Sequence, residues 1–150
     1  MIVNLRHVAI CVSDIQHAIR FYIGLGAELK SEDLESGEFI SELLQLPDCQ
    51  ISTCKLQLRD GSRIELMEFK NPHPISIDSA NTMAFLGLHH IGFTVLDIND
   101  SIRIMKSLGG RLISPPQSVP KDHSKHAVQA MHCYASDPFG NIIHLAQDII

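Results

Sequence analysis

One long segment occurs twice in this chain of 150 residues. Residues 5–29 (LRHVAICVSDIQHAIRFYIGLGAEL) and 88–112 (LHHIGFTVLDINDSIRIMKSLGGRL) align without a gap at a constant offset of 83 (88 − 5 = 83), and ten of 25 positions are identical. Unrelated amphipathic segments do not reach this similarity, so the repeat predicts two copies of one supersecondary unit. A residue that carries chemistry in one copy should therefore have a counterpart in the other. The identical pairs include His7/His90, Asp14/Asp97, Ile15/Ile98, Arg20/Arg103, Leu25/Leu108 and Gly26/Gly109.

Each copy begins with an alternating run, residues 8–12 (VAICV) and residues 91–95 (IGFTV). Period-two alternation predicts a strand with one face on the core. The other face carries small residues and one histidine, His7 or His90, as is typical of the lining of a cavity. We therefore expect both histidines to face away from the core.

A helix is predicted directly after each strand. Asp14 and Asp97 precede apolar residues at helical spacing, where an aspartate side chain can accept the free amides of the first turn. Gly26 and Gly109 follow the last apolar position, as a left-handed C-terminal cap favours. A second strand should begin after each glycine.

A shorter repeat follows in each half, residues 59–69 (RDGSRIELMEF) and residues 136–147 (SDPFGNIIHLAQ). Each predicts a turn and then a strand. Aligning the glycines of the two turns places Glu65 on His144, both on the face opposite the isoleucines and leucines. The chain is therefore expected to be an α+β protein in which the unit of strand, helix, strand and hairpin occurs twice.

The chain is expected to be one domain, with the first module at about residues 1–70, a linker at about 71–87 and the second module at about 88–150. Residues 31–52 are predicted to be an irregular insertion. Residues 114–128, with three prolines and several charges, are predicted to be a mobile loop.

Composition excludes several classes of partner. The formal charge of −5 supplies no basic stripe for nucleic acid, and no apolar run approaches the length of a membrane span. The first residues lack the pattern of a signal peptide. The four cysteines, which show no metal-binding spacing, are Cys11, Cys49, Cys54 and Cys133. We expect a cytoplasmic protein with reduced thiols and no nucleic-acid or membrane partner.

Four polar residues stand on strand faces that point away from the core: His7, Glu65, His90 and His144. The repeat relates them in pairs, so pseudo-twofold packing of the copies would bring all four to one point. Imidazole and carboxylate suit one divalent first-row metal ion such as zinc, nickel, iron, cobalt or manganese. Four such ligands leave two of six coordination positions for water or substrate.

The segments LRHVAICVSDIQHAIRFYIGLG, IELMEF, LHHIGFTV and DPFGNIIHLAQ, in this order, resemble the vicinal oxygen chelate superfamily. That superfamily includes glyoxalase I, methylmalonyl-CoA epimerase, extradiol dioxygenases, and fosfomycin- and bleomycin-resistance proteins, and the pattern is nearest to small proteins like glyoxalase I. The resemblance implies two βαβββ modules forming a cup-shaped mixed sheet around a metal, with helices on the outer face. It places the metal ligands at His7, Glu65, His90 and His144, and it implies a homodimer whose site lies within one chain or across the interface.

One residue departs from the family pattern. Members resembling glyoxalase I and the epimerase place a glutamate where this chain has His144. Three imidazoles and one carboxylate would leave the metal with more net positive charge. Glu65 would then be the only ligand carboxylate able to move a proton, which makes it the candidate catalytic residue. The alternative is that His144 abolishes metal binding.

Neighbouring residues compete for the predicted roles. His89 is adjacent to His90, but alternation places it on the core side or at the strand edge. Glu68 shares a face with the core residues of its strand, whereas Glu65 lies opposite them.

Other candidates have simpler interpretations. His123 and His126 are expected on the surface or in a loop, and His132 either there or lining the cup. Cys11 follows His7 on the same face and could touch substrate, although a small buried thiol is the commoner role.

The function expected from the resemblance is that of an enzyme, a metal-dependent lyase or isomerase of the glyoxalase type. Its substrate would be a small molecule that chelates the metal through vicinal oxygens, with Glu65 moving a proton. One alternative is an Fe(II) ring-cleaving or other dioxygenase. Another, of a different class, is a non-enzymatic small-molecule binding or resistance protein; a fosfomycin thiol transferase is a further family activity.

Overall fold

The computed structural model describes residues 1–75, 83–120 and 129–149. The chain forms two compact units, Met1–Asp78 and Ser79–Ile150, each with its own β-sheet. The division between the units falls within the linker expected from the sequence.

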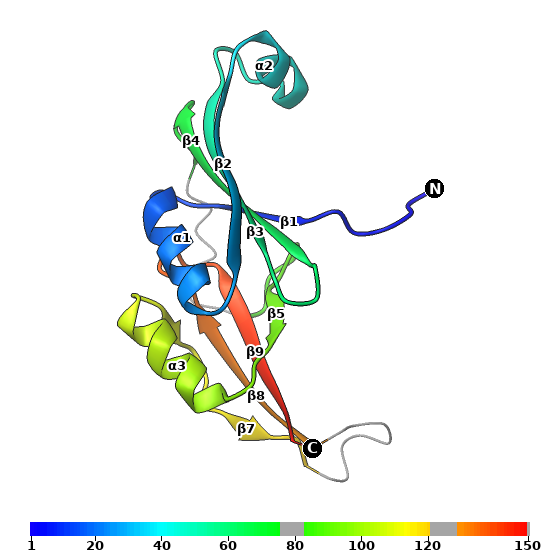
Figure 1. Ribbon diagram of the computed structural model, residues 1–150, viewed down its shortest axis with the longest axis vertical. Coiled ribbons are helices and arrows are strands. Elements are labelled where there is room, and N and C mark those ends of the chain that lie inside the picture. The colour runs from blue at the N-terminus through cyan, green and yellow to red at the C-terminus, as the bar shows by residue number, and fades with distance from the viewer. Residues whose placement is uncertain (76–82, 121–128, 150) are drawn as a thin grey trace. The chain divides into compact units, whose positions relative to one another are not determined.

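The first unit contains a four-stranded sheet in the order β1-β4-β3-β2 (Figure 1). Strand β1 is parallel to β4, and the other neighbours are antiparallel. The elements are β1 (Val8–Cys11), α1 (Ile15–Gly24), β2 (Glu28–Ser36), α2 (Glu38–Leu44), β3 (Gln50–Gln57) and β4 (Arg63–Asn71).

The second unit repeats this topology, with strands in the order β5-β9-β8-β6 and β7 paired to β8. Strand β5 is parallel to β9. The elements are β5 (Ile91–Thr94), α3 (Ile98–Ser107), β6 (Arg111–Leu112), β7 (Gln117–Ser118), β8 (Gln129–Ser136) and β9 (Ile142–Ile149). The expected α+β fold of two tandem βαβββ modules is confirmed.

The two modules also share their strand register. Ala9 lies opposite Glu65 in the first parallel pair, and Gly92 lies opposite His144 in the second. The backbone amide that follows each parallel strand donates to the neighbouring strand, Val12 to Met67 at 2.8 Å and Val95 to Ala146 at 2.7 Å. The internal repeat therefore extends from the sequence to the hydrogen bonds.

Both predicted helix caps are present. One side-chain oxygen of Asp14 accepts the amide of His17, and one of Asp97 accepts the amide of Asp100, each at 2.9 Å. Gly26 and Gly109 follow the helices with φ of 102° and 94°, a left-handed conformation that glycine adopts without strain.

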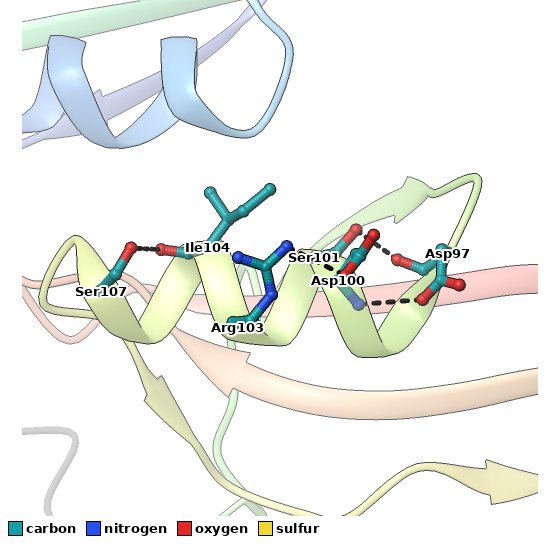
Figure 2. A network of polar contacts seen from close by, with 6 residues as sticks. All are labelled: Asp97, Asp100, Ser101, Arg103, Ile104 and Ser107. Carbon is teal, nitrogen blue, oxygen red and sulfur yellow. Dashed lines mark hydrogen bonds and ion pairs between the residues drawn. The ribbon is translucent and has the colours of Figure 1, made fainter.

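The exposed face of α3 carries a polar network (Figure 2). Arg103 pairs with Asp100 at 3.0 Å, and the hydroxyl groups of Ser101 and Ser107 donate to backbone carbonyls of the preceding turn. Arg103 therefore lies on a solvated helix face.

Each helix buries its apolar face within its own unit. In the first unit the fully buried side chains include Phe21, Leu56 and Leu66. In the second unit, Met105 and Leu145 are fully buried. Because the core fills one face of each sheet, the opposite face is left for polar side chains.

The prediction of an irregular insertion at residues 31–52 is wrong. Strand β2 continues to Ser36, and α2 follows before β3 begins. Gly37, with φ of 97°, ends the strand. Ile40 then packs with Cys49 and Ile51 in a small apolar cluster, which holds this two-turn helix in place.

The predicted loop at residues 114–128 contains one short strand, because β7 pairs with β8 through Gln117↔His132. Residues 121–128 of this segment lie outside the described residues. None of the described helices has the length and apolar character needed to span a bilayer.

Candidate functional site

The first module brings His7 and Glu65 together. His7 precedes β1 by one residue, and Glu65 projects from β4 opposite Ala9. Nε2 of His7 lies 3.1 Å from Oε2 of Glu65, with the side chains 36% and 15% exposed. Two ligand atoms bound to one ion at about 2.1 Å and at a right angle would lie about 3 Å apart, so this pair fits a metal.

Glu68, the competitor of Glu65, has a structural role. One carboxylate oxygen accepts the amide of Ile15 at 3.1 Å, and the other pairs with Lys70. In the second module Gln147 accepts the amide of Ile98 at 2.9 Å in the same way. Both side chains therefore support a helix N-terminus, and Glu65 remains the candidate ligand of its strand.

The second module brings His90 and His144 together. Their ring centroids lie 5.5 Å apart with the planes at 79°. Tyr134 contacts both rings, stacking on His144 at 4.9 Å and meeting His90 edge-on at 5.2 Å. A methyl group on Gly92 would lie 3.5 Å from Nδ1 of His144, an ordinary contact distance.

His132 joins this group, a contact that the sequence left open. Its Nδ1 lies 2.9 Å from Nε2 of His144, so one of these nitrogens carries a proton and the other accepts it. Tyr134 is the direct cross-strand partner of His144, and His132, two residues earlier on β8, shares its face. That spacing of two is the sequence signal that could have placed His132 beside His144.

The surroundings of His144 disfavour its charged form. Burial, followed by the nearby charges of His132 and His90, lowers the pKa of His144 below its usual value. A neutral imidazole is the form that binds a metal ion. The environment therefore suits a ligand role for His144.

His89, expected on the core side or at the strand edge, is half-buried and lies just before β5. Strand β5 begins at Ile91, so strict alternation does not extend back to this residue. The ring of His89 lies against Phe85 and meets the rings of His90 and Tyr134 edge-on. His89 therefore belongs to the same aromatic cluster as the predicted ligand.

The remaining candidates have separate outcomes. His123 and His126 lie outside the described residues. Cys11 is exposed, so the prediction of a buried thiol is wrong for it, whereas the other three cysteines are buried. Burial and the charge of Glu32 raise the pKa of Cys54 to about 11, so this thiol is protonated at neutral pH.

The predicted ligands occur as one pair in each module. Within residues 1–75, 83–120 and 129–149, no group of three or more His, Cys, Asp or Glu side chains could hold a metal ion. The single site built from all four residues remains a prediction.

A cavity of about 690 Å³ in the first module lies apart from these pairs. Its walls come from the turns at both ends of α2 and from Asn71 at the end of β4, and none of the predicted ligands lines it. Asn71 donates a hydrogen bond to the carbonyl of Asp48 at 2.7 Å, so part of the polar wall is already paired.

The fold and the paired side chains define a class, the tandem βαβββ proteins with candidate ligands on both parallel strand pairs. The family model of the Glyoxalase/Bleomycin resistance protein/Dioxygenase superfamily matches residues 6–128, and the chain belongs to this superfamily. The resemblance inferred from the sequence is confirmed.

Solved structures support the fold. A glyoxalase family protein from Bacillus cereus has a TM-score of 0.86 at 24% identity, covering 100% of this chain and 97% of its own. One from Enterococcus faecalis has a TM-score of 0.63 at 22% identity, with coverage of 95% and 96%.

A third similar structure is the genomically encoded fosfomycin resistance protein FosX from Listeria monocytogenes, complexed with Mn(II) and sulfate. Its TM-score is 0.55 at 16% identity, with coverage of 100% and 96%. At these identities the similarity extends to the fold alone. No curated protein matches the chain.

Proposed function

We propose that this protein is a metal-dependent lyase or isomerase of the glyoxalase type, acting on a small molecule that binds the metal through vicinal oxygens. The proposed ligands are His7, Glu65, His90 and His144. The observation that carries the proposal is the repeated register, in which each module pairs a histidine before its first strand with a polar residue opposite the second residue of that strand. We further propose a homodimer, as the family resemblance implies, located in the cytoplasm.

The donor set fits a first-row divalent metal. Three imidazoles and one carboxylate suit zinc, nickel, iron, cobalt or manganese. When bound, such an ion would act as a Lewis acid that polarises a substrate carbonyl and acidifies the neighbouring C–H bond.

Glu65 would carry the proton. Its carboxylate is half-buried beside His7, and it is the only carboxylate among the proposed ligands. Glu65 would remove the proton from the carbon beside the polarised carbonyl and return it to a neighbouring atom, so an isomerisation would need no net proton from solvent. With one base in place of two, the proton would move on a single face of the substrate.

The test is proton exchange into small α-hydroxycarbonyl compounds in D₂O, followed by NMR. We expect the metal-loaded protein to catalyse exchange at the C–H beside the carbonyl. Glu65→Gln should lower the rate about 10²- to 10⁴-fold, the usual effect of losing a general base.

Glu68→Gln, on the same strand, is the matched control and should keep the rate, because the side chain that plays its part in the second module is already a glutamine, Gln147. Full exchange by Glu65→Gln with its metal retained would show that Glu65 is not the base.

One observation favours a second candidate, a ring-cleaving dioxygenase. The contact of His132 with Nε2 of His144 can withdraw His144 from the ligand set. His7, His90 and Glu65 then have the composition of a two-histidine, one-carboxylate Fe(II) site. Oxygen uptake with a catechol by the Fe(II)-loaded protein would support this candidate, and turnover without oxygen would exclude it.

A further inference from the structure

We propose that His89 is a positioning residue that sets the tautomer of His90, so that Nε2 of His90 carries the lone pair available to a metal ion. This inference rests on the proposed function in one respect, because it takes His90 to be a ligand. The tautomer itself follows from two contacts within the second unit, and it can be measured without any metal.

The first contact fixes the proton of His89. Nε2 of His89 lies 2.5 Å from the backbone carbonyl oxygen of Met83. A carbonyl oxygen only accepts, so Nε2 of His89 must carry a proton and donate it. In a neutral imidazole the other nitrogen, Nδ1, then holds the lone pair.

The second contact fixes the position of the ring proton of His90. Nδ1 of His89 lies 2.9 Å from Nδ1 of His90. Because Nδ1 of His89 is an acceptor, Nδ1 of His90 must carry the proton in this hydrogen bond. The lone pair of neutral His90 is thereby placed on Nε2.

Aromatic packing holds His89 and His90 in position for these two hydrogen bonds. The ring of His89 stacks on Phe85 with centroids 4.7 Å apart and planes at 6°. It meets the ring of His90 at 90°, and Tyr134 meets His90 from another side at 88°. A partner on the second nitrogen that fixes ring and tautomer is the common support of a metal-binding histidine, usually supplied by a carboxylate or a carbonyl.

The sequence of the first module does not allow the same pair of contacts. The offset of the repeat places Arg6 at the position of His89. A guanidinium has donors but no acceptor, so it cannot take a proton from Nδ1 of His7. Instead, Nε2 of His7 faces the carboxylate of Glu65 and would carry a proton when metal is absent. The two histidines of the repeat should therefore differ in tautomer.

The test is ¹⁵N NMR of metal-free protein labelled in its histidine rings, at about pH 8, where unperturbed imidazoles are neutral. His90→Gln assigns the signals of His90. We expect a protonated Nδ1 and a lone-pair Nε2 for His90, the reverse of the preference of free imidazole side chains in water. A protonated Nε2 on wild-type His90 would overturn the proposal, whatever the behaviour of the His89 variants.

Two substitutions of His89 test its role. His89→Leu removes the acceptor and should shift His90 toward protonated Nε2, whereas the amide of His89→Gln can both donate to Met83 and accept from His90. With Zn(II) as the probe, His89→Leu should bind about 10- to 100-fold more weakly, and His89→Gln should stay close to the wild type. An unchanged tautomer or unchanged zinc affinity in His89→Leu would overturn the proposal.

The outcome separates this inference from the proposed function. Suppose that His90 has the expected tautomer and that neither the wild type nor either His89 variant binds zinc. The effect of His89 on the tautomer of His90 is then supported, and the proposed metal site fails. If zinc binds equally well to all three proteins, the metal site stands and the positioning role of His89 fails.

Discussion

At the scale of single residues, Glu65 and Glu68 of strand β4 have different roles because their side chains lie on opposite faces of the strand. Glu65 points toward His7, while Glu68 reaches the first amide of α1, at Ile15. Alternation along the strand was enough to prefer Glu65 as the ligand. The role of Glu68 could not be predicted, because its partner lies 53 positions away in the chain.

Glu68→Ala should lower the free energy of unfolding by about 1–2 kcal/mol, because it leaves the amide of Ile15 without this acceptor. Glu68→Gln should cost much less, as the use of Gln147 at the equivalent position implies. Urea denaturation measures both. Equal losses in the two variants would mean that the charge of Glu68, and not its hydrogen bond, supports the helix.

The cluster around His144 shows a limit of sequence patterns. Period-two spacing was enough to expect His144 on the polar face, and the structure places His90, His132 and Tyr134 beside it. The pairing of β8 with β9 decides which of these rings touch, and that register is set by a turn and by packing. Similarly, the position of His89 depends on where β5 begins.

At the scale of elements, the repeated helices were predictable and the inserted one was not. Aspartate caps, helical spacing and terminal glycines marked α1 and α3 in both copies. Helix α2 has only seven residues, which is too short for a periodic signal, and it has no side-chain cap. Its stability comes from packing against residues that follow it in the chain.

Ile40 is the buried anchor of α2, at 6% exposure, and packs with Cys49 and Ile51. Ile40→Ala should lower the free energy of unfolding by about 2 kcal/mol, because it leaves a cavity in this cluster. Leu43, on the same helix, is 63% exposed, and Leu43→Ala should change stability by less than about 0.5 kcal/mol. Urea denaturation of the two variants provides the comparison; similar losses would show that α2 does not pack through Ile40 in solution.

At the scale of the whole molecule, the internal repeat carried most of the prediction. Ten identities at one offset required two copies of one unit, and the order of patterns within a copy defined the βαβββ topology. In the structure, the parallel pairing of β1 with β4 brings Glu65 beside His7 in the first unit. The proposed joining of four ligands around one ion would depend on packing between distant segments, which local periodicity does not encode.

The central proposal is that the two pairs together hold one divalent metal ion. Its most direct test is the metal content of untagged protein, purified without chelator and measured by mass spectrometry beside His144→Ala and the control Glu68→Gln. We predict about one ion per chain in the wild type and in the control, and much less in His144→Ala. No metal in the wild type, even after anaerobic reconstitution with iron, nickel or zinc, would contradict the proposal and favour a non-enzymatic binding role.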